Sequence, residues 1–176
     1  MINDVFGRIE YDERGAGPTI VFVPGSCSTG AAWRPVIAAL GARFRVVTTS
    51  LPGYGSTEER RTPIDPPMVR EVEVAEQVIR RAAGLRGEPV HLIGHSFGGL
   101  VSLAVALRGR APLASLVMVD APAPSLLRAS GDRHHYRAFR EMTDRYFADY
   151  MRGEPEAIAN MIDFYGGAGA FASLPP

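Results

Sequence analysis

The sequence predicts an α/β fold in three layers (α/β/α), with helices covering both faces of a mostly parallel sheet. Short, apolar, β-branched runs alternate with longer segments of helical periodicity. These runs are apolar at nearly every position, which is typical of strands buried on both faces. The chain has 176 residues, of which 46% are hydrophobic and 22% charged, and this suits one globular domain.

The first third of the chain is expected to supply two buried strands and one helix. Residues 5–14 alternate apolar and polar side chains, which is typical of a half-exposed strand. The β-branched and aromatic runs over 19–23 and 44–48 suit strands that are buried on both faces. Between them a loop over 24–30 opens a helix, whose apolar positions are Trp33, Val36, Ile37 and Leu40.

The middle of the chain continues the alternation of helices and strands. Residues 56–67 are polar and carry three prolines, so we expect a surface loop. The next helix has one apolar face, formed by Met68, Val72, Ala75, Ile79 and Ala82. Residues 89–93 and 116–119 are expected to be buried strands. Residues 98–107 lie between them as a helix that is apolar nearly all round, so we expect it to be deeply buried.

Residues 126–176 are expected to form a helical lid or cap segment that follows a core over residues 1–125. After the last strand the pattern is helical only. The first long helix carries an aromatic stripe that we interpret as packing surface, formed by Tyr136, Phe139, Met142, Tyr146, Phe147 and Tyr150. A second, shorter helix is expected to begin at Glu154 and Pro155, because proline is favoured in the first turn of a helix.

The composition excludes several classes of function. The 19 basic and 19 acidic residues cancel, so we expect neither a nucleic-acid partner nor a membrane surface. Every basic residue is arginine, and a chain without lysine has no Schiff base, pyridoxal phosphate linkage or Walker lysine. Cys27 is the one cysteine, so no intrachain disulfide can form. There is no signal peptide pattern and no apolar run near the ~18 residues of a membrane span, so the expected location is the cytoplasm.

The strongest chemical signal is the motif G-x-S-x-G over residues 94–98, between a predicted strand and a predicted helix. A serine on such a tight turn projects its hydroxyl beyond the sheet edge, and glycines on either side leave room for the turn. The N-terminal dipole of the following helix favours negative charge that develops beside Ser96. The blander interpretation is a serine that caps the helix. The coincidence of strand, motif and helix favours Ser96 as a nucleophile.

The chain resembles the α/β-hydrolase fold family from about residue 5 to residue 120, in the order of its elements and in two motifs, Gly94-His95-Ser96-Phe97-Gly98-Gly99 and Pro52-Gly53-Tyr54-Gly55. The resemblance implies an oxyanion hole made by two backbone N–H groups, one from Phe97 and one from Ser26 or Cys27. In the family, the loop after the first buried strand often begins with His-Gly, and here it begins with Pro24-Gly25. Because the donor belongs to the backbone, this departure leaves the expectation intact.

Asp120 is the candidate catalytic acid. A serine hydroxyl needs a base to accept its proton and a third group to orient that base. In the resembled family the chain order is serine, acid, histidine, and the resemblance implies further strands that carry the histidine and usually the acid. Asp120 ends the last predicted strand, at the sheet edge where ligands collect. The alternative is a residue that caps the turn before Pro122.

Four histidines are candidates for the base. His91 lies inside a predicted strand and His95 is the variable residue of the elbow, so we interpret both as structural. His134 and His135 follow Ser96 in the required order, and a solvated polar turn is the blander interpretation. Asp132 beside this pair lacks further metal ligands, so no metal site is expected.

Together these observations predict a serine hydrolase that acts on a small ester or related acyl substrate, without a metal or organic cofactor. A serine at the elbow argues against relatives with an aspartate nucleophile, such as epoxide hydrolases and haloalkane dehalogenases. The alternative is a catalytically incomplete fragment, or a non-catalytic module that binds a ligand or partner. We expect a fragment of a longer hydrolase, because the final strands of the resembled fold are not present. If residues 116–119 are the last strand, their apolar edge invites pairing with a partner or with a second copy as a homo-oligomer, and the remaining alternative is that the helices of residues 126–176 cover it.

Overall fold

The computed structural model describes residues 1–4 and 7–174. The chain divides into two compact units, unit 1 (Met1–Pro122) and unit 2 (Ala123–Pro176). Unit 1 contains a five-stranded sheet of order β3-β5-β4-β6-β7. Its strands are β3 (Asp12–Arg14), β4 (Thr19–Val23), β5 (Arg45–Thr48), β6 (Val90–His95) and β7 (Leu113–Val119). Only β3 is antiparallel to its neighbour, so the expectation of a mostly parallel sheet is confirmed.

The N-terminal segment is not the single strand that the alternation over 5–14 predicts. A separate antiparallel pair precedes the sheet, formed by β1 (Ile2–Asp4) and β2 (Gly7–Ile9). Residues 5 and 6 of the predicted strand lie outside the described residues. The break falls at Glu10, whose N–H donates to the Thr57 hydroxyl (3.0 Å) and whose carbonyl accepts from the Thr49 hydroxyl (2.7 Å). Because both backbone groups of Glu10 bind side chains, they do not extend a strand ladder.

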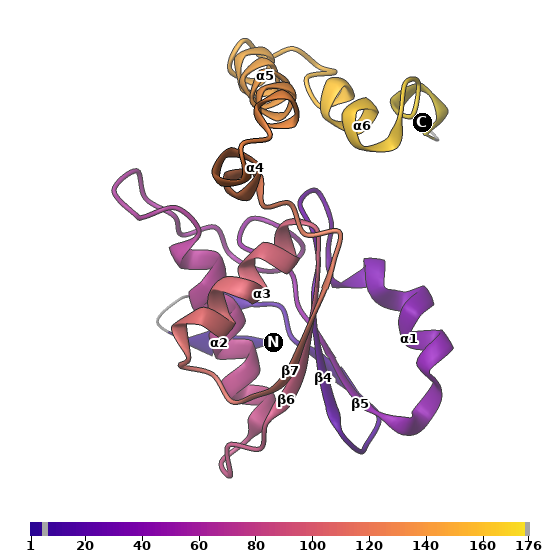
Figure 1. Cartoon of the computed structure of the whole chain (residues 1–176). Coiled ribbons are helices and arrows are strands. Elements are labelled where there is room, and N and C mark those ends of the chain that lie inside the picture. Colours follow the sequence, from indigo (N-terminus) through magenta and orange to yellow (C-terminus); the bar gives the residue numbers. More distant parts are fainter. Residues whose placement is uncertain (5–6, 175–176) are drawn as a thin grey trace. The chain divides into compact units, whose positions relative to one another are not determined.

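Helices cover both faces of the sheet (Figure 1). One face carries η1, a 3-10 helix (Gly30–Trp33), and α1 (Arg34–Leu40), and the other carries α2 (Val69–Ala83) and α3 (Phe97–Arg108). The core on the α1 side contains Ile20, Phe22, Trp33, Ile37 and Val46. The larger core on the α2 and α3 side includes Val21, Val23, Val78, Leu92 and Val101. Successive β4 residues enter opposite cores, as the two-residue period of a strand requires, and the three-layer architecture is confirmed.

Two expectations about burial are wrong. Helix α3 buries one face, through Val101, Ser102 and Val105, whereas Leu107 on another face is 80% exposed. Its apolar composition therefore does not mean that other elements pack against every face of the helix. Strand β7 was expected to be buried, yet Val117 and Met118 are each 46% exposed. The reason is topological, because within the described residues β7 pairs with β6 alone and ends the sheet.

Unit 2 is helical, with α4 (Pro124–Ser130), α5 (Arg133–Met151), α6 (Ala159–Gly166) and the 3-10 helix η3 (Phe171–Ser173). The helix expected to begin at Glu154 and Pro155 begins later, at Ala159. Residues 154–159 instead form turns in which an N–H donates to the carbonyl three positions earlier, such as the Ala157 N–H to the Glu154 carbonyl (3.2 Å). Of the aromatic stripe on α5, Met142 is buried, whereas Phe147 and Tyr150 are exposed. No helix in the described part of the chain combines the length and apolarity needed to cross a bilayer.

Candidate active site

Ser96 occupies the turn between the end of β6 and the start of α3, as the elbow motif predicts. Its backbone has a φ of 51° and a ψ of −125°. The Ser96 N–H donates to the Val119 carbonyl of β7 (2.8 Å), and the Ser96 carbonyl accepts from the N–H groups of Gly99 (2.9 Å) and Leu100 (3.2 Å). The main chain is therefore held by β7 on one side and by α3 on the other. The half-buried side chain makes no hydrogen bond to any described residue.

The glycines of the elbow are required by close backbone packing. A Cβ at Gly98 would lie 2.6 Å from the Val23 carbonyl oxygen and still closer to that of Pro24. A Cβ at Gly94 would lie 2.5 Å from the Ser102 hydroxyl and still closer to the Gly98 carbonyl oxygen. Real Cβ atoms do not approach other atoms so closely, so a side chain at Gly98 would force α3 away from β4, and one at Gly94 would force α3 away from β6.

Backbone strain gathers at one edge of the sheet. Among the described residues, four that are not glycine have a positive φ, and three of them are Cys27 (55°), Ser96 (51°) and Asp120 (46°). These three follow the carboxyl ends of β4, β6 and β7, which are adjacent parallel strands. Such strain costs about 1–3 kcal/mol per residue and clusters at functional sites. The edge that carries Ser96 is therefore the candidate active site.

The loop over residues 24–29 packs against the elbow. A Cβ built on Gly25 would lie 3.0 Å from the Ser96 Cβ, so only a glycine allows this approach. Ser26 and Cys27 follow at exposed positions. Among the hydrogen bonds of the described residues, none is donated by the N–H of Ser26 or Phe97. The Phe97 N–H belongs to the first turn of α3, where helical amides have no partner within the helix.

Asp120 follows Val119, the residue whose carbonyl accepts the Ser96 N–H. It is exposed, and its left-handed φ of 46° turns the chain away from the end of β7. Aspartate tolerates this conformation better than most residues do. The carboxylate makes no hydrogen bond or ion pair with any residue in the described ranges. Asp120 thus lies at the same edge as the elbow, with its charge uncompensated by a neighbour.

The two histidines of β6 have neighbours that suit structural roles. His91 Nδ1 lies 2.8 Å from the Ser115 hydroxyl on β7. The His95 ring meets the Trp33 ring edge to face, with centroids 6.3 Å apart and planes at 90°. Its Nδ1 lies 3.2 Å from the point where a Gly25 Cβ would be, so the ring covers the start of the 24–29 loop. Trp33 was expected only as a core residue.

His134 and His135 lie in unit 2, in the first turn of α5. Asp132 caps this helix, because its Oδ1 accepts the His135 N–H (3.1 Å). Its Oδ2 lies 2.8 Å from His135 Nδ1. This arrangement satisfies an N-terminal amide of α5, so helix capping accounts for the Asp132 and His135 contact.

These contacts predict a low pKa for Asp132. The His135 N–H, and then its ring, stabilise the ionised carboxylate and hold the pKa of Asp132 below its usual range. Because the folded pKa is the lower one, this stabilisation is present above the ordinary aspartate pKa and is lost as the pH falls through the folded value. A carboxyl NMR titration should give a lowered midpoint that His135→Ala raises only partly, since the backbone N–H remains. An ordinary aspartate midpoint in the wild type would contradict the capping geometry.

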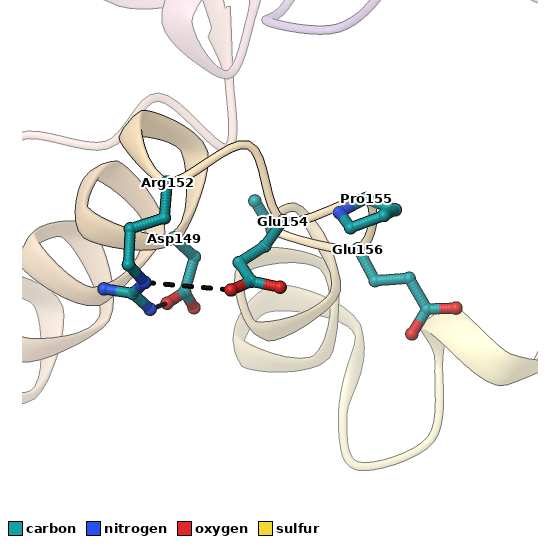
Figure 2. Close-up of a pocket in the computed structure, with 6 residues that line it drawn as sticks. Asp149, Arg152, Glu154, Pro155 and Glu156 are labelled. Carbon is teal, nitrogen blue, oxygen red and sulfur yellow. Dashed lines mark hydrogen bonds and ion pairs between the residues drawn. The ribbon is translucent and has the colours of Figure 1, made fainter.

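Unit 2 contains a surface hollow of about 420 Å³ between α5 and α6, lined by Asp149, Arg152, Glu154, Pro155, Glu156 and Ala157 (Figure 2). Arg152 forms ion pairs with Asp149 and with Glu154, so the charges are largely paired among themselves. The lining has no serine, cysteine or histidine, and it does not include Ser96. Within the described ranges, no three His, Cys, Asp or Glu side chains form a potential metal site.

One polar network near the candidate site was not predicted. It joins Glu10 to Ser50 and to Gly30, where the loop after β4 enters η1. No motif marks these residues, because they are 20 and 40 positions apart in the chain. Glu10 lies in the alternating segment that predicted an ordinary strand.

Comparison with known proteins gives many matches. The model of the Alpha/beta hydrolase family matches residues 20–175. A pimeloyl-[acyl-carrier protein] methyl ester esterase of Aeromonas hydrophila is 34% identical over 116 residues, covering 63% of this chain and 41% of the relative. A putative carbamate hydrolase of Caulobacter is 30% identical over 153 residues, covering 82% of this chain and 54% of the relative. The chain thus spans about half or less of the length of these curated relatives.

Solved structures agree on the fold. An α/β hydrolase from Sphaerobacter thermophilus has a TM-score of 0.62 at 22% identity, covering 99% of this chain and 75% of the other. An esterase from Exiguobacterium antarcticum has a TM-score of 0.60 at 25% identity, covering 70% and 45%. An epoxide hydrolase from Bacillus megaterium has a TM-score of 0.73 at 23% identity, covering 98% and 61%. Because the family model matches residues 20–175, which is most of this chain, the chain belongs to the α/β-hydrolase family.

Proposed function

We propose that this chain carries the nucleophile of a serine hydrolase that acts on a small ester or a related acyl substrate. The observation that carries the proposal is Ser96, held in a strained turn between β6 and α3 with its hydroxyl unengaged by the described residues. A strand-turn-helix serine flanked by close-packed glycines is the arrangement that presents a nucleophile at a sheet edge.

In the proposed reaction the Ser96 oxygen attacks the acyl carbon as its proton passes to a base. The negative charge on the former carbonyl oxygen is received by the backbone N–H groups of Phe97 and Ser26. Collapse of this intermediate expels the alcohol, which takes up a proton, and leaves an acyl-enzyme on Ser96. Water then attacks the acyl group and releases the acid. The unpaired state of both N–H groups supports their role as oxyanion donors.

The names of the relatives support the substrate class. The Aeromonas relative is an esterase of a methyl ester and the Caulobacter relative is a putative carbamate hydrolase, so both names describe carbonyl compounds. The epoxide hydrolase neighbour, at 23% identity, supports the fold alone. Serine at position 96 favours acyl transfer. In that reaction the nucleophile attacks the carbonyl carbon of the ester, and the carbonyl oxygen becomes an oxyanion that backbone N–H groups can stabilise.

The proton acceptor for Ser96 comes from one of two sources. One is His134 or His135 of unit 2, and the other is a histidine outside this chain. His91 and His95 are engaged with Ser115 and Trp33, which supports their exclusion. The apolar outer edge of β7, unpaired by any described strand, supports self-association through this edge as a further part of the proposal.

We propose Asp120 as the acid that orients the base. Asp120→Asn keeps the size of the side chain and removes its charge, so an imidazolium formed during the reaction would lose its partner. Ester turnover should then fall about 10⁴-fold, with little change in KM, because the charge matters most in the transition state. Asp12→Asn, which neutralises an exposed aspartate on β3, is the matched control. Turnover of Asp120→Asn equal to that of this control would remove Asp120 from the proposal.

The proposed function is tested by hydrolysis of p-nitrophenyl acetate and butyrate, with the corresponding anilides as a harder amide substrate. We expect saturable ester hydrolysis that depends on Ser96. Hydrolysis that is equally fast without the Ser96 hydroxyl would overturn the proposed function.

A further inference from the structure

A buried hydrogen-bond network lies behind the 24–30 loop, at the end away from Ser96. The Gly30 N–H donates to the Ser50 hydroxyl oxygen (3.1 Å), and the Ser50 hydroxyl donates to Glu10 Oε1 (3.0 Å). The Ser56 N–H donates to the other carboxylate oxygen of Glu10 (2.9 Å). Ser50 is fully buried and Glu10 is half-buried. Each oxygen of the Glu10 carboxylate therefore receives one hydrogen bond, and the two donors come from separate residues.

The Glu10 main chain is fixed as firmly as its side chain. Its N–H and carbonyl bind the hydroxyls of Thr57 and Thr49, both of which are buried. The Thr57 hydroxyl in turn donates to the Ser50 carbonyl (2.8 Å). Glu10 thus joins the segment after β2 to the end of β5 and to the turn over 53–57. Because Glu10 is held through its N–H, its carbonyl and its carboxylate, it provides a rigid support for Ser50.

The loop that carries Ser26 is held at both of its ends. At one end Gly25 packs against Ser96, as described above. At the other end Gly30 is so close to the end of β5 that a Cβ there would lie 2.9 Å from the Thr49 carbonyl oxygen. The Ser50 hydroxyl binds the Gly30 amide at this second end. The position of the Ser26 N–H therefore depends on two anchors, one of which is the Glu10 and Ser50 relay.

We infer that Glu10 is a positioning residue for the oxyanion donor of the Ser26 loop. Acting through Ser50, it fixes Gly30 and so holds the loop in the geometry that places the Ser26 N–H for the transition state. This inference rests on the proposed function, and it assigns to Glu10 no contact with the substrate.

The chemistry explains why a carboxylate stands here. The Ser50 hydroxyl and the Ser56 N–H both donate to the Glu10 carboxylate. Among the ion pairs of the described residues, none involves Glu10. Its charge therefore serves to provide two acceptors rather than to bind a cation. A glutamine offers one carbonyl acceptor, and its NH₂ group would face a donor. Because such a glutamine can turn its carbonyl toward Ser50 and keep that hydrogen bond, the variant that breaks the relay is Glu10→Ala, which removes both acceptors.

The experiment compares Glu10→Ala with wild type by amide hydrogen exchange at Gly30 and by ester kinetics. We expect exchange of the Gly30 N–H to become about tenfold faster and kcat to fall about tenfold, which is the loss of one typical hydrogen bond. KM should stay within about twofold, because an oxyanion donor acts on the transition state alone. Glu58→Ala is the matched control, since Glu58 is a carboxylate whose ion pair is with Arg60 at the surface. This control should change neither quantity.

A double variant tests the relay itself. Ser50→Ala removes the group through which Glu10 acts, so Glu10→Ala should add little further loss on that background. Ser50→Ala also carries the test if Glu10→Ala does not fold. Additive losses, unchanged exchange at Gly30, or faster exchange with an unchanged kcat would each overturn the inference. Ser96→Ala in the same assay separates the two proposals, because retained hydrolysis there overturns the function, whereas Gly30 exchange still reports on the anchor.

Discussion

Replacing Ser96 by Ala should reduce ester turnover by about 10⁴-fold or more, to the rate of residual catalysis by the site without its nucleophile. The hydroxyl is the atom that forms the acyl-enzyme, and no other group can replace it in that step. The loss should appear in kcat, since the hydroxyl acts in the bond-forming step and not in substrate binding. Steady-state hydrolysis of p-nitrophenyl butyrate measures it directly, and a binding module would keep its ligand affinity in this variant.

Ser26→Ala is the matched control for this result. It removes a second serine hydroxyl at the same edge, but the proposed donor at position 26 is the backbone N–H, which alanine retains. Turnover should stay within about threefold of wild type, because only the donor N–H stabilises the oxyanion. Equal losses in both variants would mean that the hydroxyls act through a general effect on the edge and not through attack by Ser96.

Replacing Gly98 by Ala should lower the free energy of unfolding of unit 1 by about 3 kcal/mol. The new methyl group would lie 2.6 Å from the Val23 carbonyl oxygen and still closer to that of Pro24. Both atoms belong to the main chain at the end of β4, so neither can rotate away. Alanine in a helix is otherwise favoured over glycine by about 1 kcal/mol. A destabilised variant therefore reports the close contact between α3 and β4 and not a loss of helix propensity.

The measurement is urea unfolding followed by the fluorescence of Trp33, the one tryptophan, which is buried in the core of unit 1. Gly87→Ala is the control, because Gly87 has a φ of +63° with no atom within 4 Å of an added Cβ. It should cost about 1 kcal/mol through backbone strain alone. If Gly98→Ala is no less stable than this control, the elbow does not pack on β4 as described.

Local signals predicted most of the fold. The strand β4 and the elbow after β6 are each specified by a few neighbouring residues, an apolar run in one case and a glycine-flanked serine in the other. Burial of β7 could not be predicted in this way, because it depends on which strand lies beyond it and not on its own residues. The break at Glu10 was missed for a similar reason, since its hydrogen-bond partners Thr49 and Thr57 are 39 and 47 positions away.

The site likewise divides into features that neighbouring residues specify and features that depend on residues far away in the chain. Ser96 carries a motif, and its strained turn agrees with that motif. Asp120 carries no motif in the sequence, and only the structure gives its left-handed backbone beside the elbow. Ser50 looks like an ordinary serine at the end of a strand. Its place between Gly30 and Glu10 results from long-range packing, which leaves no pattern in the neighbouring residues.

The central claim is that Ser96 is an activated nucleophile, and a fluorophosphonate probe tests it most directly. The probe forms a covalent phosphonyl ester with an activated serine and releases fluoride. Peptide mass spectrometry after labelling should find one adduct, on the peptide that contains Ser96, and none in the Ser96→Ala variant. An adduct on another serine, such as Ser26 or Ser102, or equal labelling of the variant, would contradict the account.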